Sequence, residues 1–316
     1  MKGNRVLITG GTGFIGSWLT ERWYEENLVT LFDNGRRNAF QFLPENVKRK
    51  VELVTGDIQN SDQVLKVVKG KDIIVHLAAI AGASFYEKDP LLTLDVNLFG
   101  TANLLKSLIN RDIEQVIIAS SSEVYGSMAV DVKETDVTQI GSIFEGRWSY
   151  AVSKIAADHL AFAYFRKYGM PITIVRPFNI YGPRQIGEGA VTNMLMDGLN
   201  SKVIKVTGSG DQKRAWCFVY DFVDAIDLIC KNKIKGECFN IGNPEDYITI
   251  LELAKKISTL CGGCKIKFLK GRKTEILKRK PSIERAQQTL GFNPKVNIDE
   301  GLTKTYQWWI ENIAKF

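Results

Sequence analysis

The stretch "ITGGTGFIGSWL", residues 8–19, decides the fold of this chain. It joins an apolar run to a segment with helical spacing of apolar residues through a glycine-rich turn. Gly10 permits a tight turn, Gly13 lets a ligand approach the backbone, and Gly16 lets a helix pack closely on a strand. Such a turn is a weak signal alone, but its place between strand and helix strengthens it. The stretch therefore predicts the first βα unit of a dinucleotide-binding sheet.

Short β-branched runs alternate with longer amphipathic segments through the first half of the chain. This alternation is typical of repeated βαβ units and predicts an α/β fold with a doubly wound parallel Rossmann sheet. The expected strands cover residues 5–9, 29–32, 51–55, 73–77, 116–120 and 172–175. The expected helices lie near residues 14–25, 62–68, 91–109 and 149–168.

The rhythm of the sequence changes after "RPFNIYGPR", residues 176–184, where glycine-punctuated segments begin. We expect a dinucleotide-binding domain over residues 1–176 and a smaller substrate-binding domain over residues 177–316. The run "CFNIG" at 238–242 reads as a strand that returns to the first sheet. Residues 215–245 are therefore expected to belong to the first domain, which makes the two domains interleaved.

Length and composition exclude several classes of protein. A chain of 316 residues with 45% hydrophobic content can bury a large core. No apolar run approaches the roughly 20 residues that span a bilayer, and the start of the chain enters a strand without a cleavable signal region. We expect a cytoplasmic protein with no membrane partner.

The five cysteines, an odd number, indicate reduced thiols. Cys261 and Cys264 have the spacing of a metal or redox pair, but no second pair follows, and the only histidines are His76 and His159. We therefore expect no metal site.

Basic residues are concentrated in "KIKFLKGRKTEILKRK", residues 265–280, which holds eight of them and one acidic residue. Such a run can bind nucleic acid, form a solvated surface, or cradle a small phosphorylated ligand. The run is single and carries one aromatic residue, Phe268, so we favour the last two and expect no nucleic-acid partner.

Asp33, at the end of the second expected strand, indicates the kind of dinucleotide. A carboxylate there accepts from both ribose hydroxyls and repels a 2′-phosphate, which favours NAD as the cofactor. Arg36 and Arg37 follow closely enough to leave NADP open.

Further cofactor contacts are expected where other strands end. "GDI" offers Asp57 to the adenine edge, and "HLAA" supplies small residues that let backbone meet cofactor. His76 in that motif has two equally good interpretations: a strand-end histidine whose hydrogen bonds are satisfied within the protein, or a residue that contacts the cofactor. The predicted cofactor-binding residues outside the catalytic group are Gly10, Gly13, Phe14, Ile15, Gly16, Asp33, Asn34, Asp57, Ile58, Leu77, Ala78, Ala79, Asn97 and Pro177.

"RWSYAVSK" places Tyr150 and Lys154 four residues apart, on one face of an expected helix. An ammonium group beside a phenol, helped by a cationic nicotinamide, lowers the phenol pKa toward neutrality. Tyr150 is then able to take a proton from a substrate hydroxyl while hydride leaves the same carbon. We expect both residues to contact the cofactor as well.

With these motifs in order, the sequence resembles the extended short-chain dehydrogenase/reductase family, whose members epimerise, dehydrate or decarboxylate nucleotide sugars. The resemblance covers essentially the whole chain and rests on "GGTGFIG", "HLAA", "DVNLFGT", "SSSEVYG", "YAVSK", "RPFNIYGPR", "GSGDQKRAWCFVYDFVDA" and "RKPSIERAQQTLGF". It implies that Ser121 orients the reacting oxygen, Tyr150 is the base, and Lys154 is its partner. It also implies that Asn97 supports the site, Asn179 lies near the sugar diphosphate, and Arg214 binds that diphosphate.

The resemblance implies hydride removal from C4 of a UDP-sugar to NAD and leaves the second step open. Dehydratases of this family carry Asp-Glu where this chain has Ser122 and Glu123, so 4,6-dehydration is disfavoured. A 4-epimerase has no use for Glu123. The Ser-Glu pair looks like UDP-glucuronate decarboxylases, and "SFYEKDP" with Tyr86, "RWSYAVSK" and "KRKPSI" with Arg279 lean the same way.

A decarboxylase needs few groups beyond those that oxidise C4. The resulting β-keto acid loses carbon dioxide readily, and the protein supplies a cation for the carboxylate and an acid for C5. Arg184 or Arg279 is expected to be the cation, and Glu123 with Ser122 the acid. Each of these residues also has a purely structural interpretation. Glu123 would then be a hydrogen-bonded carboxylate at the strand end, Tyr86 an aromatic residue in the packing, and Arg279 an exposed charge.

UDP-glucuronate decarboxylation is thus our first expectation and 4-epimerisation of a UDP-sugar the second. A 4-keto-sugar reductase would consume NAD(P)H stoichiometrically, and a dinucleotide sensor of this fold would usually have lost Tyr150 or Lys154. We also expect a homodimer through helices near 91–109 and 149–168, because "IAADHLAFAYF" is apolar enough to need two buried faces.

Overall fold

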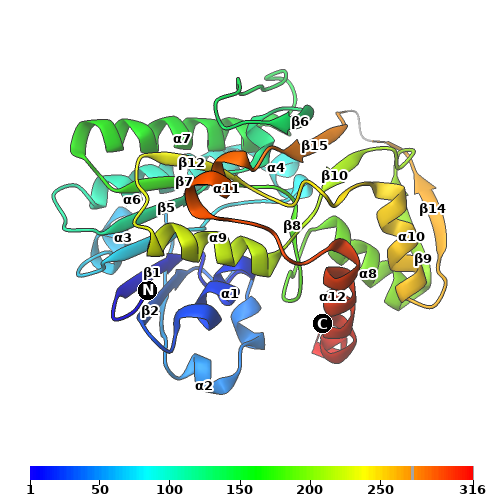
Figure 1. Cartoon of the computed structure of the whole chain (residues 1–316), viewed down its shortest axis with the longest axis horizontal. Helices are drawn as coiled ribbons and strands as arrows, with labels where there is room; N and C mark the ends of the chain where they lie inside the picture. Colours follow the sequence, from blue (N-terminus) through cyan, green and yellow to red (C-terminus); the bar gives the residue numbers. More distant parts are fainter. Residues whose placement is uncertain (272–273, 316) are drawn as a thin grey trace.

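A computed structural model describes residues 1–271 and 274–315 of the chain (Figure 1). Among these residues, seven strands form one parallel sheet in the order β12-β7-β5-β4-β1-β2-β3. The six expected strands are present within two residues of their predicted ends, which confirms the fold class. The strands are β1 (Arg5–Thr9), β2 (Leu28–Asp33), β3 (Glu52–Thr55), β4 (Ile73–His76), β5 (Gln115–Ala119), β7 (Ile172–Pro177) and β12 (Glu237–Ile241).

Both faces of this sheet are covered by helices, as the alternation along β1 requires. Val6 and Ile8 pack toward α1 (Phe14–Trp23) and α9 (Val219–Lys231), whereas Leu7 packs toward the other layer. That layer contains α3 (Ser61–Val67), α6 (Gly100–Ser107) and α7 (Trp148–Tyr168). The strand order reverses between β1 and β4, so a crevice opens at the carboxyl ends of these two strands.

The expected helix over residues 91–109 is interrupted. The structure has α5 (Pro90–Leu94), a π-helical turn (Asp95–Phe99) and then α6. The turn directs Asn97 inward, where its side chain accepts from the Ile80 N–H at 2.7 Å and donates to the Ile80 carbonyl at 3.1 Å. A π-helical turn of this kind commonly accompanies a functional site.

The second half of the chain builds smaller sheets beside the first. One has the order β13-β10-β15-β6, and two pairs join β8 with β11 and β9 with β14. These strands are β6 (Met128–Val132), β8 (Ile180–Tyr181), β9 (Val203–Thr207), β10 (Lys213–Ala215), β11 (Cys217–Phe218), β13 (Tyr247–Thr249), β14 (Lys265–Leu269) and β15 (Lys278–Pro281). The remaining helices are α2 (Glu45–Lys48), α4 (Ala83–Lys88), α8 (Ala190–Ser201), α10 (Ile250–Leu260), α11 (Glu284–Leu290) and α12 (Ile298–Asn312).

Two late segments complete the first sheet and its cover. β12 pairs with β7 in parallel from Glu237 beside Thr173 to Ile241 beside Pro177. α9 packs on α1, where Trp23 Nε1 donates to Asp227 Oδ1 at 3.0 Å. We keep the division into interleaved domains at about Pro177 as a proposal that this arrangement supports.

Three further expectations concern single features. The five cysteines are all buried and free. The basic run 265–280 is spread over β14 and β15, and its residues Arg272 and Lys273 lie outside the described part of the chain. Within that described part, no helix has the length and apolar character to cross a membrane.

Candidate active site

The glycine turn lies at the carboxyl end of β1 and has the geometry that its sequence predicts. Gly10 has φ +70°, and a Cβ atom there would lie 2.7 Å from the Ala78 nitrogen. A Cβ at Gly16 would lie 2.5 Å from the Gly11 carbonyl oxygen. α1 begins directly after Gly13, so its free N–H groups and positive dipole end face the crevice. A side chain at Gly10 or Gly16 would collide with this backbone and push the helix N-terminus out of place, so the glycines hold the close turn that a dinucleotide pyrophosphate requires.

Asp33 ends β2 beside this turn. Its carboxylate accepts from the Thr12 N–H at 3.1 Å and from the Gly35 N–H at 2.8 Å, which fixes it at the edge of the crevice. Arg36 and Arg37 turn to α4 instead, with their Cζ atoms 4.6 and 5.1 Å from the centre of the Phe85 ring. Both arginine side chains contact Phe85. The Asp33 carboxylate is therefore the group placed to accept hydrogen bonds from a ribose.

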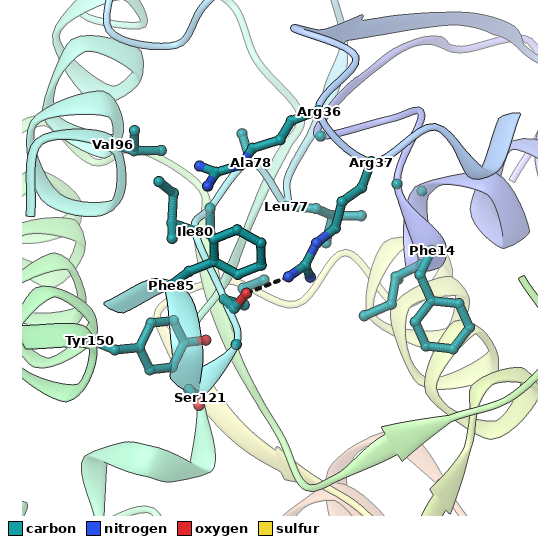
Figure 2. Close-up of a pocket in the computed structure, with 18 of the residues that line it drawn as sticks. Phe14, Arg36, Arg37, Leu77, Ala78, Ile80, Phe85, Val96, Ser121 and Tyr150 are labelled. Carbon is teal, nitrogen blue, oxygen red and sulfur yellow. Dashed lines mark hydrogen bonds between the residues drawn. The ribbon is translucent and has the colours of Figure 1, made fainter. Parts of the chain in front are cut away.

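Arg37 also crosses the crevice, and sequence reasoning did not foresee this. Its Nη2 donates to the Ala81 carbonyl at 2.7 Å, and Figure 2 shows its side chain between Phe14 and Phe85. Burial lowers the pKa of Arg37, and the charge of Glu188 opposes that effect. The only sequence signal was the proximity of Arg37 to Asp33.

A cleft of about 730 Å³ runs from the glycine turn to the end of β5. It brings together most of the predicted residues from nine separate stretches of sequence. Those that line it are Gly10, Gly13, Phe14, Ile15, Gly16, Asp33, Asn34, Asp57, Ile58, Leu77, Ala78, Ala79, Tyr86, Ser121, Ser122, Glu123, Tyr150, Lys154, Pro177, Asn179 and Arg279.

Asn97 and His76 lie one layer behind this lining. Asn97 holds the Ile80 backbone and donates to Ser153 Oγ at 3.1 Å, so it acts on the cleft through its neighbours. His76 is buried between Thr9 Oγ1 and Thr101 Oγ1, at 2.7 and 3.0 Å from its ring nitrogens. Burial lowers the pKa of His76 to about 3. It is therefore a neutral, satisfied strand-end histidine.

Tyr150, Lys154 and Ser121 meet at the deep end of the cleft. The Ser121 hydroxyl lies beside the Tyr150 phenol, and Figure 2 shows the two side chains side by side. Lys154 Nζ donates to the Ala119 carbonyl at 2.8 Å and lies 5.9 Å from the centre of the Tyr150 ring. Tyr86 stacks on Tyr150 with ring centres 5.4 Å apart.

The expected lowering of the Tyr150 pKa included a cationic nicotinamide as well as Lys154. Without that ring, burial raises the pKa of Tyr150 to about 12, and the nearby Ser121 hydroxyl lowers it only in part. Burial likewise lowers the pKa of Lys154 to about 8, against the charge of Asp158. A buried phenol of this kind needs further positive charge beside it before it becomes a base.

Glu123 is clamped between two arginines. Arg279 Nη1 donates to its Oε1 at 2.5 Å, and Arg147 Nη2 donates to its Oε2 at 3.1 Å. Burial raises the pKa of Glu123, but the charges of Arg279 and Arg147 outweigh burial, so the net pKa is lowered. The carboxyl group is therefore ionised at neutral pH. The role of Glu123 with Ser122 as the acid at C5 stays a prediction, and the sequence did not reveal the second arginine.

Arg214 lies farther out along the same opening, in a connected hollow of about 430 Å³ that Arg147 and Asn179 also line. Burial lowers the pKa of Arg214 to about 10, and the like charge of Arg279 adds to that effect. Asn179 has φ +44° and donates from Nδ2 to the Ala215 carbonyl at 2.8 Å. The half-buried Arg214 guanidinium donates to the carbonyls of Lys213 and Ile276, and its positive charge beside the hollow is suited to an anionic ligand.

Arg184 is the predicted residue that the structure does not bring to the cleft. Its backbone has φ +68°, and its guanidinium pairs with Glu21 Oε2 at 2.6 Å in α1. The same group lies 3.9 Å above the centre of the Trp18 ring. Because Glu21 and Trp18 of α1 hold this side chain, it does not line the cleft, and the structure offers Arg279 and not Arg184 as the cation beside Glu123.

Arg147 is the site residue that sequence reasoning missed. It stands in "RWSYAVSK", three residues before Tyr150, where it reads as an ordinary residue ahead of a helix. Its spacing to Tyr150 was the available signal, since residues i and i+3 share a helix face.

Comparison with known proteins agrees with this geometry. The profile of the NAD dependent epimerase/dehydratase family matches residues 6–242. A UDP-N-acetyl-alpha-D-glucosaminuronate decarboxylase of Bacillus cytotoxicus is 33% identical over 318 residues, covering 97% of this chain and 98% of its own length. UDP-glucuronic acid decarboxylase 1 of Danio rerio is 34% identical over 309 residues, covering 96% of this chain and 72% of its own length.

A solved structure gives the same result for the fold. A variant of UDP-glucuronic acid 4-epimerase from Bacillus cereus, in complex with UDP-4-deoxy-4-fluoro-glucuronic acid and NAD, superimposes with a TM-score of 0.89. It is 27% identical in sequence and covers 98% of this chain and 99% of its own. The likeness therefore extends over both halves of the molecule.

Proposed function

The chain belongs to the NAD dependent epimerase/dehydratase family, and from that premise we propose that it is a UDP-glucuronate decarboxylase that uses bound NAD catalytically. The observation that carries the proposal is the Glu123 carboxylate, clamped between Arg147 and Arg279 in the cleft that Tyr150 lines. An epimerase that only transfers hydride has no use for such a cluster. A uronate brings a carboxylate to the sugar end of the cleft, where positive charge is in excess.

In the proposed reaction, Tyr150 takes the proton of the C4 hydroxyl, which Ser121 orients. Bound NAD would supply a reversible hydride acceptor for C4 and a positive ring beside the Tyr150 phenol. Lys154 keeps a cation behind the phenol, and Asn97 holds the supporting backbone. Asp33 and the glycine turn hold the dinucleotide at its ribose and pyrophosphate.

Oxidation at C4 makes the sugar a β-keto acid, so the C5–C6 bond breaks and carbon dioxide leaves. The electron pair of that bond enters the enolate of C4 and C5, and a proton then returns to C5. Arg279 faces the leaving carboxylate and the developing charge. Glu123 is a carboxylate in the resting site, so it orients the proton donor at C5, for which a water molecule beside Ser122 is our candidate.

Weighing the products tests the function directly. We expect purified protein incubated with UDP-glucuronate to give a product lighter by roughly 44 mass units, with no net consumption of NAD. UDP-N-acetylglucosaminuronate and UDP-glucose belong in the same panel, because one relative is named for the first of these sugars. Loss of roughly 18 mass units, which is water, would instead identify a dehydratase.

A 4-epimerase is the second candidate function. Ser121, Tyr150 and Lys154 suffice for reversible hydride transfer, and a structural neighbour is a UDP-glucuronic acid 4-epimerase. An unchanged mass with altered chromatographic retention in the same assay would favour it. Stoichiometric oxidation of NADH would identify the reductase.

The proposal includes a homodimer that works in the cytoplasm. Five buried free thiols suit a reducing compartment. On the outer side of α5 and the π-helical turn, Leu91 and Phe99 are 68% and 57% exposed, and α5 packs beside α7. Large exposed apolar side chains along neighbouring helices favour a helical interface between two copies.

Light scattering at micromolar concentration checks the dimer. We expect a mass of two chains for the wild type and one chain for the Leu91→Glu/Phe99→Glu double variant, because two buried charges oppose the apolar interface. Leu28→Glu is the matched control, since Leu28 is 69% exposed at the start of β2, away from these helices. A monomeric wild type would contradict the proposal.

A further inference from the structure

Arg147 connects the catalytic helix to the acidic residue of the cleft. It directly precedes α7, three residues before Tyr150, and its guanidinium donates to Glu123 Oε2 at 3.1 Å. The side chain is only 7% exposed. The first turn of α7 therefore carries both the proposed base and the arginine that holds the carboxylate.

The Glu123 carboxylate is fixed on both of its oxygens by different elements. Arg279 on β15 binds Oε1, Arg147 binds Oε2, and the Glu123 N–H donates to Ser121 Oγ at 3.1 Å. Ser121 in turn lies beside the Tyr150 phenol. Removing Arg147 would release one oxygen and break the direct link between Glu123 and α7.

Charge at this point is not balanced within the protein. The ionisable groups that face Glu123 are Arg279 from β15, Arg147 ahead of α7, Arg214 from β10 and Tyr150 from α7. Three guanidinium groups face the Glu123 carboxylate, and Glu275 offsets part of the charge of Arg214, which leaves positive charge in excess. Arg147 and Arg279 each keep a buried Nε–H without a hydrogen-bond partner among the described residues. Excess buried positive charge favours an anionic ligand.

We propose that Arg147 is the positioning residue of Glu123, which it holds ionised and fixed relative to Tyr150. With Arg279 and Arg214, it also favours a nucleotide sugar that carries a C6 carboxylate over a neutral hexose. This inference rests on the proposed function and adds to it a residue that no sequence motif assigned. Arg147 acts through Glu123, and its contribution is therefore visible in the ionisation of that carboxylate.

The pH dependence of kcat/KM tests the role of Arg147. A carboxyl group whose pKa is lowered by partners is ionised above that pKa, and its function is lost as pH falls through it. Arg147→Gln removes one of the lowering charges, so we expect the acid limb of the profile to move to higher pH. We expect kcat/KM for UDP-glucuronate to fall by about tenfold to a hundredfold near neutral pH, and more in acid.

Two variants keep the experiment decisive. Arg147→Lys retains the charge but loses the planar donor, so its acid limb should stay near that of the wild type while kcat falls. Arg184→Gln is the matched control, because it removes an equally buried arginine–glutamate pair outside the cleft. It should lower stability without moving the acid limb. If Arg147→Gln does not fold, an Arg147→Lys enzyme with wild-type kcat would overturn the proposal.

Substrate selection gives the second measurement. We expect the ratio of Kd values for UDP-glucose and UDP-glucuronate to fall by about tenfold in Arg147→Gln, while the Kd of UDP changes little. An unchanged ratio together with an unmoved acid limb would refute the inference.

A readout independent of the reaction separates this inference from the proposed function. Infrared spectra report the C=O stretch of a protonated carboxyl group. The band of Glu123 is identified by its absence from the spectrum of Glu123→Gln. We expect that band to emerge at higher pH in Arg147→Gln than in the wild type. If the wild type releases no carbon dioxide but the band still shifts, the proposed function fails and the role of Arg147 stands. If carbon dioxide is released and the band does not shift, the proposed function stands and the role of Arg147 fails.

Discussion

Tyr150→Phe should leave the fold and NAD binding intact and lower turnover by at least about a hundredfold, the usual scale for a lost acid–base group. The phenol lies beside Ser121 and is stacked on Tyr86, and Tyr150 stands one helical turn before Lys154 on α7. The substitution keeps the ring and its stacking, so it removes only the oxygen that exchanges the C4 proton. Steady-state rates with UDP-glucuronate provide the measurement.

Two controls accompany this variant. NAD binding by calorimetry should match the wild type, because the glycine turn and Asp33 are untouched. Tyr24→Phe removes a hydroxyl that bonds Glu25 at the surface and should keep the wild-type rate. Near-wild-type turnover in Tyr150→Phe would exclude Tyr150 as the base.

Glu123→Gln should separate the two leading functions. In a decarboxylase, we expect the variant to bind UDP-glucuronate and to form product roughly two orders of magnitude more slowly, because the carboxylate that orients proton transfer is gone. In an epimerase, we expect an effect under about tenfold, since Ser121, Tyr150 and Lys154 still carry out reversible hydride transfer. Product formation and release of carbon dioxide are measured together.

Glu21→Gln is the matched control for this change. Glu21 also pairs with a buried arginine, Arg184, but it lies in α1 outside the cleft. The Glu21→Gln variant measures the loss of stability that follows when a buried guanidinium loses its partner, and it leaves the residues of the cleft unchanged. A wild type that interconverts C4 epimers without releasing carbon dioxide, with a nearly silent Glu123→Gln, would promote the epimerase.

The sheet was predictable because each strand is a local pattern. In β1, Val6 and Ile8 face one layer and Leu7 the other, and an apolar run covered on both faces needs no partner to be recognised. The break at residues 95–99 was not predictable, because its cause is the contact of Asn97 with Ile80, which lies far away in sequence. The spacing of apolar residues predicts a helix over 91–109, but it carries no information on the contact between Asn97 and Ile80.

The site residues divide in the same way. The glycine turn and the Tyr150–Lys154 pair depend on spacing within one element, and their neighbours in the cleft follow from the ends of parallel strands. The partners of Glu123 depend on how β15 and α7 approach each other, which no local pattern encodes. Arg184 and Arg147 show the consequence: both are buried arginines paired with glutamates, yet only Arg147 lies at the cleft.

The late return of β12 has a consequence for how the chain is made. Residues 237–241 supply the edge strand beside β7, and α9 at 219–231 covers α1, the helix that follows the glycine turn. As the chain leaves the ribosome, residues 1–176 therefore emerge with a bare strand edge and an uncovered apolar face on α1. An unpaired strand edge promotes aggregation. Residues 1–176 therefore complete their sheet only after β12 has been synthesised. We therefore expect that residues 1–176 do not form a separable unit, and that a fragment truncated at residue 176 is recovered only as insoluble protein.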